Sequence, residues 1–401
     1  MLLQAGLAAI MGILLFAPYL LEAQHSFGQQ QDGNETFMEM PIERFIPYGN
    51  NTLNVHDIGI DTSRQILFFT DSDNRALVLY DLRNNITKSV EIGPYPYAVA
   101  VNSTTDKAYV MHACNCPAGL DVTVVDYSKG IESARVEDTV VGVSRYAAPI
   151  ALNPNTGRVY VGSGSGSLTV IDGSNNNEIV GRIGKSINVQ GIDVNPKTNE
   201  VYVIDNATTL YKIDGATNKV VGNVTIGLPP DEVNATGNIL KAIAVNPDTN
   251  VVYVINQILY GSRSPNEGVS FSTGYLVAVN GTSNAIISPD ITKSSLYLTI
   301  NSNTNTIYVM SGGGIVEVDG LSNDVVLRGY VPNLEEYISH LVVDESTNKL
   351  YLQGQTGIFQ VSDNDNKVNA PEFHNYFVML VPALAITAAV ILTRRHSNKG
   401  H

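Results

Sequence analysis

Three soft metal ligands stand within five residues of one another in this sequence. His112, Cys114 and Cys116 lie in the stretch MHACNCPAG, which holds the only two cysteines of the chain. Two thiolates and one imidazole suit copper or zinc, but no fourth ligand is visible. In an oxidising compartment a Cys114–Cys116 disulfide is the favoured alternative, and free or intermolecular thiols are the third. Apart from such a metal ion, the sequence predicts no cofactor.

Two acidic stretches superficially resemble calcium loops. They are Asp71-Ser-Asp73-Asn74 and Asp363-Asn-Asp365-Asn366. Each lacks the glycine and the distal glutamate of a helix-loop-helix calcium site, which favours solvated turns. The chain also contains no GxSxG elbow, no GxxxxGK phosphate loop and no HExxH motif. The motifs therefore lean against an enzyme without deciding the question.

The chain repeats itself seven times. Stretches such as VAVNSTTDKAYV, IALNPNTGRVYV and IDVNPKTNEVYV align on one aromatic column, whose members are Phe68, Tyr109, Tyr160, Tyr202, Tyr253, Tyr308 and Tyr351. Spacings of 41, 51, 42, 51, 55 and 43 residues between them suit one four-stranded blade per repeat. Short apolar or alternating runs separated by Asn-Pro, Thr-Asn and Asp-Gly turn signals predict strands, and no helical period is sustained.

A second column of short polar residues stands seven positions before the aromatic one. A side chain of this type can hydrogen-bond the backbone two residues further on, so turn capping is favoured over a ring of metal ligands. The column consists of Asp61, Asn102, Asn153, Asn195, Asn246, Asn301 and Asp344.

The units NPxTNxVYV, followed by VIDGxTNKVV, resemble the YVTN-repeat β-propeller family of archaeal and bacterial surface proteins. The likeness covers about residues 40 to 366 and is strongest in the fourth unit. It implies an all-β, seven-bladed β-propeller of four-stranded blades. The last unit lacks its outer strand after GIFQVS, and the segment Met40 to Gly49 resembles an outer strand. This N-terminal strand is therefore expected to close the ring, which removes open sheet edges.

One face of such a ring carries most of the irregular sequence, including Gln190 and the insertion Asn256 to Gly274. Function is expected there, because rigid scaffolds commonly present recognition residues on variable loops. The MHACNCPAG stretch is expected in one of these loops. The candidate ligand-binding residues on this face are His56, Tyr95, Tyr97, Arg145, Tyr146, Asp231, Glu232, Glu335, Glu336 and His340.

The two ends of the chain predict export and anchoring. Residues 1–23 read as a signal peptide, with an uncleaved anchor as the alternative because no Lys or Arg precedes the apolar run. Residues 376–393 are uncharged and long enough for one transmembrane helix, and Arg394 and Arg395 follow them. The expected order is a flexible segment 24–39, the propeller 40–366, a linker 367–375, the membrane helix 376–393 and a cytoplasmic tail 394–401. The predicted location is the cell membrane, with a single span and the propeller outside.

The surface chemistry agrees with an exported protein. The net charge is −14, which repels phosphate backbones and argues against nucleic acid as a partner. Eight Asn-x-Ser/Thr sequons offer weak support for glycosylation in an exported domain. They begin at Asn34, Asn50, Asn85, Asn102, Asn206, Asn223, Asn234 and Asn280.

Three functions remain open on these grounds. The leading hypothesis is a binding or structural surface protein that contacts cell-envelope proteins or glycans through the irregular face. The second is an enzyme of the lactonase or lyase kind with a metal site at the channel mouth, which fold alone cannot support. The third is an extracytoplasmic metal-handling protein that uses His112, Cys114 and Cys116.

Overall fold

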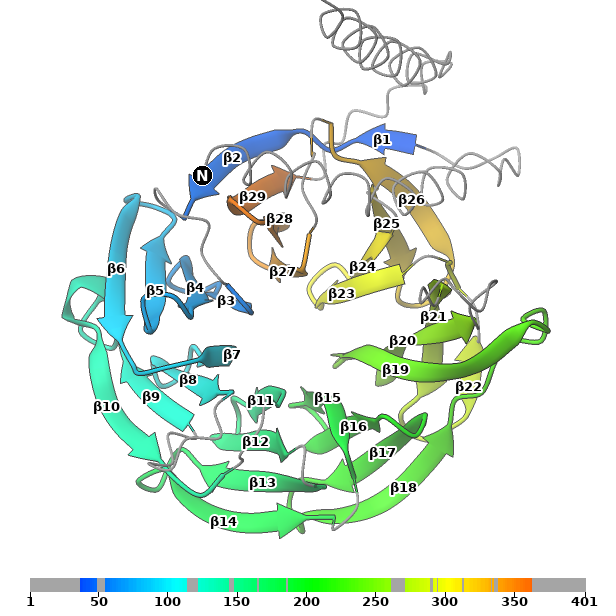
Figure 1. Cartoon of the computed structure of the whole chain (residues 1–401), viewed down its shortest axis with the longest axis horizontal. Coiled ribbons are helices and arrows are strands. Elements are labelled where there is room, and N and C mark those ends of the chain that lie inside the picture. Colours follow the sequence, from blue (N-terminus) through cyan, green and yellow to red (C-terminus); the bar gives the residue numbers. More distant parts are fainter. Residues whose placement is uncertain are drawn as a thin grey trace, which may run out of the picture.

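The computed structural model describes residues 37–48, 55–113, 122–143, 148–163, 166–184, 187–260, 271–288, 291–293, 295–311, 314–332, 334 and 338–362. These residues form 29 strands and one 3₁₀ turn, η1 (Ile131–Ser133). The strands gather into seven sheets around a central axis (Figure 1). The predicted seven-bladed, all-β propeller is confirmed. Among the described residues no helix is long and apolar enough to cross a membrane, and the predicted span 376–393 lies outside them.

Each blade is an antiparallel meander whose first strand is innermost. The first three blades consist of β3 (Ile58–Asp61), β4 (Ile66–Asp71), β5 (Ala76–Asp81), β6 (Ile86–Glu91); β7 (Pro96–Asn102), β8 (Lys107–His112), β9 (Val122–Asp126), β10 (Arg135–Val140); and β11 (Ile150–Asn153), β12 (Arg158–Ser163), β13 (Ser167–Asp172), β14 (Glu178–Ile183). Blades 4 and 5 consist of β15 (Val189–Asn195), β16 (Glu200–Asp205), β17 (Thr209–Asp214), β18 (Lys219–Thr225); and β19 (Ala235–Asn246), β20 (Val251–Tyr260), β21 (Phe271–Asn280), β22 (Ile286–Ser288). Blades 6 and 7 contain β23 (Ser295–Asn301), β24 (Thr306–Ser311), β25 (Gly314–Asp319), β26 (Val325–Tyr330); and β27 (His340–Asp344), β28 (Lys349–Gln353), β29 (Gly357–Ser362).

An N-terminal strand closes the ring as predicted. Strand β2 (Ile42–Pro47) pairs antiparallel with β29 and becomes the fourth strand of blade 7, with Pro47 opposite Gly357. The last blade is therefore built from both ends of the described chain, and β2 covers the outer edge of β29 that would otherwise stay open.

A further strand, which the sequence did not predict, lies just before the closing strand. Strand β1 (Phe37–Glu39) pairs parallel with β26 and gives blade 6 a fifth strand. The next residue, Met40, is fully buried, and its N–H donates to Tyr330 O at 2.8 Å. A Cβ at Gly329 would collide with the Met40 sulfur. The segment 24–39 was predicted to be flexible, and for these three residues that prediction was wrong.

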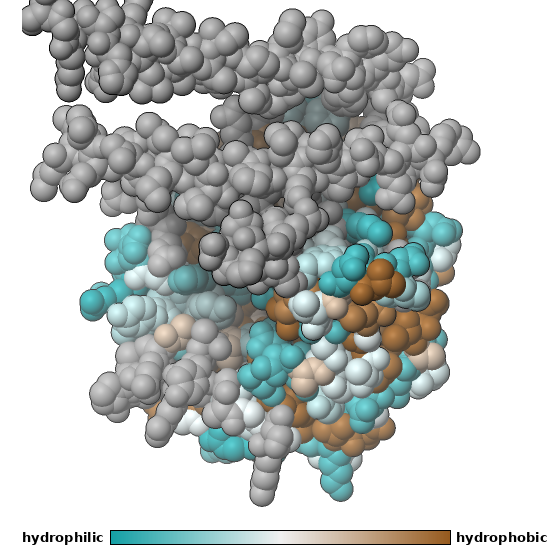
Figure 2. Space-filling model, turned by 45° about the vertical axis from the view of Figure 1, so that its right-hand side comes forward, coloured by the Kyte–Doolittle hydropathy of each residue, from teal (hydrophilic) through white to brown (hydrophobic). Residues whose placement is uncertain are grey.

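Seven apolar clusters fill the junctions between blades. Each cluster combines buried residues of two consecutive blades, and one of the seven joins blade 7 to blade 1. Both faces of the middle strands are therefore covered, as in β4, where all six residues are buried. Outer strands alternate instead and leave Val221, Ile287 and Val326 exposed, and Figure 2 shows apolar patches mixed with polar residues on one side of the ring.

The aromatic column points from each blade into the next. Tyr253 of blade 5 is fully buried, and its hydroxyl donates to Asn323 Oδ1 of blade 6 at 2.7 Å. The Tyr202 hydroxyl of blade 4 likewise donates to Gly281 O of blade 5 at 3.2 Å. A Cβ at Gly281 would overlap this hydroxyl. The Asp-Gly element of the repeat is therefore explained, because glycine admits the tyrosine of the preceding blade.

The polar column has a second role that the sequence analysis missed. As predicted, each side-chain oxygen caps its own turn; Asn195 Oδ1, for example, accepts from Lys197 N at 2.9 Å. Its amide nitrogen also donates to Asn250 Oδ1 of the next blade at 2.7 Å, and Asn250 has a φ of 53°. Equivalent bonds link Asn153 to Asn199, Asn246 to Asn305 and Asn301 to Asn348. At the junction of blades 7 and 1 the direction is reversed, and Gln65 Nε2 donates to Asp344 Oδ2 at 2.6 Å. Amide contacts of this kind therefore cross five of the seven junctions among the described residues.

We expect Tyr253→Phe to lower the free energy of unfolding by about 1 kcal/mol, because it leaves the half-buried Asn323 Oδ1 without its donor. Tyr160→Phe is the matched control. Tyr160 occupies the same column and is fully buried, but its hydroxyl has no hydrogen-bond partner among the described residues. Its substitution should change stability by less than about 0.5 kcal/mol. Denaturant titration of both variants checks this, and equal losses would show that the hydroxyl contacts do not stabilise the junctions.

Candidate functional site

The inner strands all begin on one side of the ring, which we call the upper face. In four blades the register shifts at this point, and the extra residue is exposed: Tyr97, Gln190, Lys241 and Leu296. A bulge of this kind re-aims a side chain at the edge of a sheet. Among the pairs formed by the inner strands, all register shifts thus lie toward the upper face.

One position of the repeat separates three blades from the other four. Eleven residues before the aromatic column, blades 2 to 5 carry the small or non-titrating residues Ala98, Pro149, Gly191 and Ala242. The consecutive blades 6, 7 and 1 carry Tyr297, His340 and Asp57 there. Adjacent inner strands contact one another around the whole ring. The chemically active side chains are therefore gathered on one sector of the upper face.

Two ring contacts join this sector into an arc over four blades. The rings of Tyr297 and His340 lie 5.3 Å apart between centroids, and those of His56 and Tyr97 also lie 5.3 Å apart. Interplanar angles of 35° and 37° are tilted arrangements of the kind that aromatic side chains favour. We call these four residues the aromatic arc. Three of them, His56, Tyr97 and His340, were predicted from the sequence, whereas Tyr297 was not.

Asp57, which follows His56 of the arc, is hydrogen-bonded to the backbone of two blades of the propeller. Its carboxylate accepts the N–H of Ile58 at 2.9 Å and that of Val99, in blade 2, also at 2.9 Å. The Thr70 hydroxyl accepts the N–H groups of His56 and Asp57 at 3.1 Å each. Burial raises the pKa of Asp57, while His340 and the two backbone donors oppose that rise. Aligning the repeat at this position would have found Asp57.

The pKa of the His56 imidazole lies below its ordinary value. Burial lowers the pKa of His56, the charge of His340 lowers it further, and Asp73 opposes both. Beside His340, Gln353 donates from Nε2 to Val55 O at 2.8 Å. Its Oε1 and His340 Nδ1 are buried and have no hydrogen-bond partner among the described residues. The arc therefore combines aromatic ring faces with two buried polar atoms, His340 Nδ1 and Gln353 Oε1, that have no hydrogen-bond partner among the described residues.

Other predicted residues lie away from the arc. Tyr95 is 60 % exposed on the loop before β7, and its carbonyl accepts the N–H of Ala113 at 2.8 Å. Asp231 is exposed on the connection between blades 4 and 5. Arg145, Tyr146, Glu335 and Glu336 lie outside the described residues.

Glu232 forms a separate cluster on the lengthened strands of blade 5. Its carboxylate accepts hydrogen bonds from Tyr260 and Tyr275, and Lys293 lies 5.3 Å from the centre of the Tyr275 ring. Burial acts to raise its pKa, but the two hydroxyls and Lys293 hold the pKa below its ordinary value. The insertion Asn256 to Gly274 was predicted to be irregular. It instead continues β20 and β21 as paired strands, apart from residues 261–270, which the structure does not describe.

His112 is not the loop residue that the sequence analysis expected. It ends β8 and is fully buried. Its Nδ1 lies 2.8 Å from Pro94 O, which can only accept, and its Nε2 lies 2.9 Å from the Thr123 hydroxyl. A metal at His112 would displace one of these bonds, while Cys114 and Cys116 lie outside the described residues. Within the described ranges no three His, Cys, Asp or Glu side chains are grouped for a metal ion. The copper, zinc or disulfide hypotheses stay predictions.

Burial separates the predicted glycosylation sites. Asn102 is 1 % exposed, and its side-chain oxygen accepts from Thr104 N at 3.0 Å, so the folded chain offers no surface for a glycan there. The prediction for Asn102 was therefore wrong. Asn85, Asn206, Asn223 and Asn234 are exposed and Asn280 is half-buried, whereas Asn34 and Asn50 are not among the described residues.

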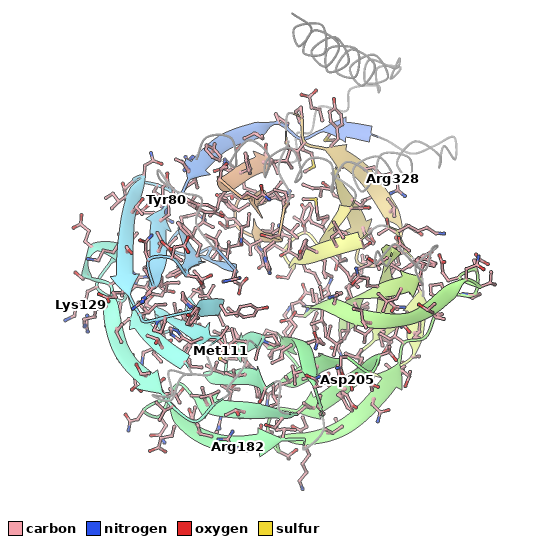
Figure 3. The ribbon with its side chains drawn as sticks, viewed as in Figure 1. Tyr80, Met111, Lys129, Arg182, Asp205 and Arg328 are labelled. Carbon is pink, nitrogen blue, oxygen red and sulfur yellow. The ribbon has the colours of Figure 1, made fainter. Side chains whose placement is uncertain are left out.

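The opposite face holds a cavity that the sequence did not predict. Its volume is about 500 Å³, and it lies between the turns of blade 1 and the 3₁₀ turn of blade 2. Arg64, Arg83 and Lys129 line it together with Ile66 and Ile131, and Figure 3 places Lys129 at the outer rim. Arg64 is already paired with Asp106 at 2.6 Å. The cavity and the aromatic arc therefore lie on opposite faces of the propeller.

Comparison with solved structures shows the same architecture. The chain resembles one from Kuenenia stuttgartiensis hydrazine synthase (TM-score 0.59, 14 % identity), over 83 % of this chain and 98 % of that one. It also resembles a chain of a mitotic checkpoint complex (TM-score 0.57, 13 % identity, 81 % and 93 % covered). The Myceliophteria thermophila Cps50 (Swd1) β-propeller domain gives a TM-score of 0.57 at 13 % identity, with 81 % and 100 % covered. These likenesses show the fold alone. No family model and no curated protein matches the sequence, so the YVTN-repeat likeness stays a prediction.

Asp193 should make stability depend on pH. It faces Tyr202 across the inner pair of strands, and its carboxylate accepts from Val194 N at 2.8 Å and from Val245 N of the next blade at 2.7 Å. Burial raises its pKa to about 6. Because the folded chain binds this proton more tightly than the unfolded chain, Asp193 contributes its full stabilisation below about pH 4. That contribution is lost as the pH rises through about 6 and the carboxyl ionises.

We therefore expect the free energy of unfolding of the wild type, measured relative to that of Asp193→Asn, to fall by up to about 3 kcal/mol between pH 4 and pH 7. Denaturant titrations of both proteins across this range measure the difference. A constant offset would mean that the Asp193 pKa is the same in the folded and unfolded chains.

Proposed function

We propose that the chain is a membrane-anchored extracellular propeller that binds a cell-envelope glycan or protein on its upper face, with the aromatic arc at the centre of the contact. The observation that carries this proposal is the asymmetry of the repeat. Three consecutive blades place Tyr297, His340 and Asp57 where the other four place small or non-titrating residues. The ring contacts with His56 and Tyr97 extend the same sector.

Binding is favoured over catalysis by the state of the acidic group. Both oxygens of Asp57 accept backbone N–H groups, one of them from the neighbouring blade. A carboxylate held in this way positions two inner strands and is poorly placed to act as a general base. Tyr97 is 36 % exposed, and its ring offers a surface for contact.

The location outside the cell is supported by the ends of the chain. An apolar run near residue 1, a second run at 376–393 followed by Arg394 and Arg395, and the exposed sequons agree with an exported, anchored domain.

Export and anchoring are tested by fractionation. The mature chain should begin near Gln24 and sediment with membranes, and deletion of residues 376–393 should release it. The control is a deletion of linker residues 367–375, which should leave it with the membranes. A full-length chain that stays in the soluble fraction would contradict the anchor, and a mature chain that begins at Met1 would replace the cleaved signal with a second anchor.

Binding is tested with purified protein and isolated cell envelopes. We expect Tyr97→Ala and His340→Ala each to weaken retention roughly tenfold, the loss typical of a central interface residue. Tyr95→Ala is the matched control, because Tyr95 is likewise an exposed tyrosine, just before β7, but makes no ring contact with the arc among the described residues. Protease or periodate treatment of the envelopes distinguishes a protein from a glycan ligand. Unchanged retention of both arc variants would refute the arc as the binding site.

A further inference from the structure

The aromatic arc presents π-faces beside negative charge. Tyrosine rings attract cations placed over their faces within about 6 Å. Both oxygens of Asp57 act as acceptors, as they do in a carboxylate, and the exposed Asp73 lies close enough to influence the His56 pKa. The net charge of −14 adds a long-range attraction for cations.

A buried acceptor of blade 7, beside His340, has no donor among the described residues. Gln353 is only 1 % exposed and stands opposite His340 in the ladder between β27 and β28. Because Val55 O can only accept, the amide nitrogen of Gln353 must face it, and this determines the orientation of the amide. Its Oε1 is then an acceptor without a partner among the described residues. A buried acceptor of this kind costs free energy until a donor reaches it.

We propose that the arc binds a guanidinium or primary ammonium group, such as the side chain of an arginine or lysine. Such a group supplies positive charge for the face of an arc tyrosine such as Tyr97 and an N–H donor for the buried acceptor of Gln353. A neutral sugar supplies donors without charge, and a quaternary ammonium supplies charge without donors. This inference rests on the proposed function, since it names the ligand chemistry of the same arc.

Ligand-observed NMR titration of the full-length protein with methylguanidinium tests the proposal. Tetramethylammonium and methyl glucoside serve as probes that lack donors or charge. We expect methylguanidinium to bind at least several-fold more tightly than either. Tyr97→Ala should weaken it about tenfold, whereas Tyr97→Phe should retain binding because the ring remains.

The acceptor is tested separately. Gln353→Leu should weaken methylguanidinium binding and leave tetramethylammonium binding unchanged, because only the former donates hydrogen bonds. Tyr95→Ala should change neither. Comparing agmatine with an N-acetylated, C-amidated arginine distinguishes a free amine from a peptide side chain as the source of the group.

The outcomes separate this inference from the proposed function. If methylguanidinium does not bind, or binds equally well after Tyr97→Ala, the inference is overturned. If methyl glucoside binds instead and its binding depends on Tyr97, the inference is also overturned, but the arc is retained as a binding site.

Discussion

The closed ring depends on side-chain contacts between blades. Among the described strands, every ladder joins strands of one blade, with only β1 and β2 brought in from the N-terminal segment. Adhesion between blades must therefore come from the apolar clusters and from the aromatic side chain, Phe68 or a tyrosine, that each junction receives from the preceding blade. Tyr109, Tyr202, Tyr253 and Tyr308 also carry a hydroxyl bond across their junctions. A ring closes only when every junction forms, so this requirement explains why one aromatic residue recurs in each repeat.

Much of this architecture could be predicted from the sequence, because repeated requirements leave repeated residues. The blade count, the turn caps and the closing strand β2 all followed from the alignment of the repeats. Strand β1 did not, since three residues that pair parallel with β26 carry no alternating pattern. The amide contacts between Asn195 and Asn250 were also missed, because a local turn motif already accounted for the asparagine column.

The site was only partly predictable, for a related reason. His56, Tyr97 and His340 attracted notice as unusual residues near irregular loops, and the structure brings them together. Tyr297 and Asp57 lie on inner strands, where they resemble ordinary strand or turn residues until the same position is compared in all seven blades. His112 was predicted to lie in a loop, but strand β8 continues up to His112, two residues before Cys114, and His112 is buried. In a repeat protein, a departure from the repeat at a shared position is therefore a better guide to a site than reactive residue type alone.

Asp57 connects the site to the stability of the ring. The inner edge of each innermost strand carries N–H groups that no further strand can satisfy. Asp57 satisfies one of them, Val99 N in blade 2, and Asp193 does the same for Val245 N in blade 5, two positions further along its own strand. The same position of the neighbouring blades holds Ala151 and Ala244, and the hydrogen bonds of Asp193 serve only the junction between blades 4 and 5. Asp57 serves the junction between blades 1 and 2 while standing between His56 and Ile58 at the start of an inner strand. The carboxylate that holds these two blades together thus directly follows His56 of the aromatic arc, so the position of this part of the arc and the cohesion of the junction are physically linked.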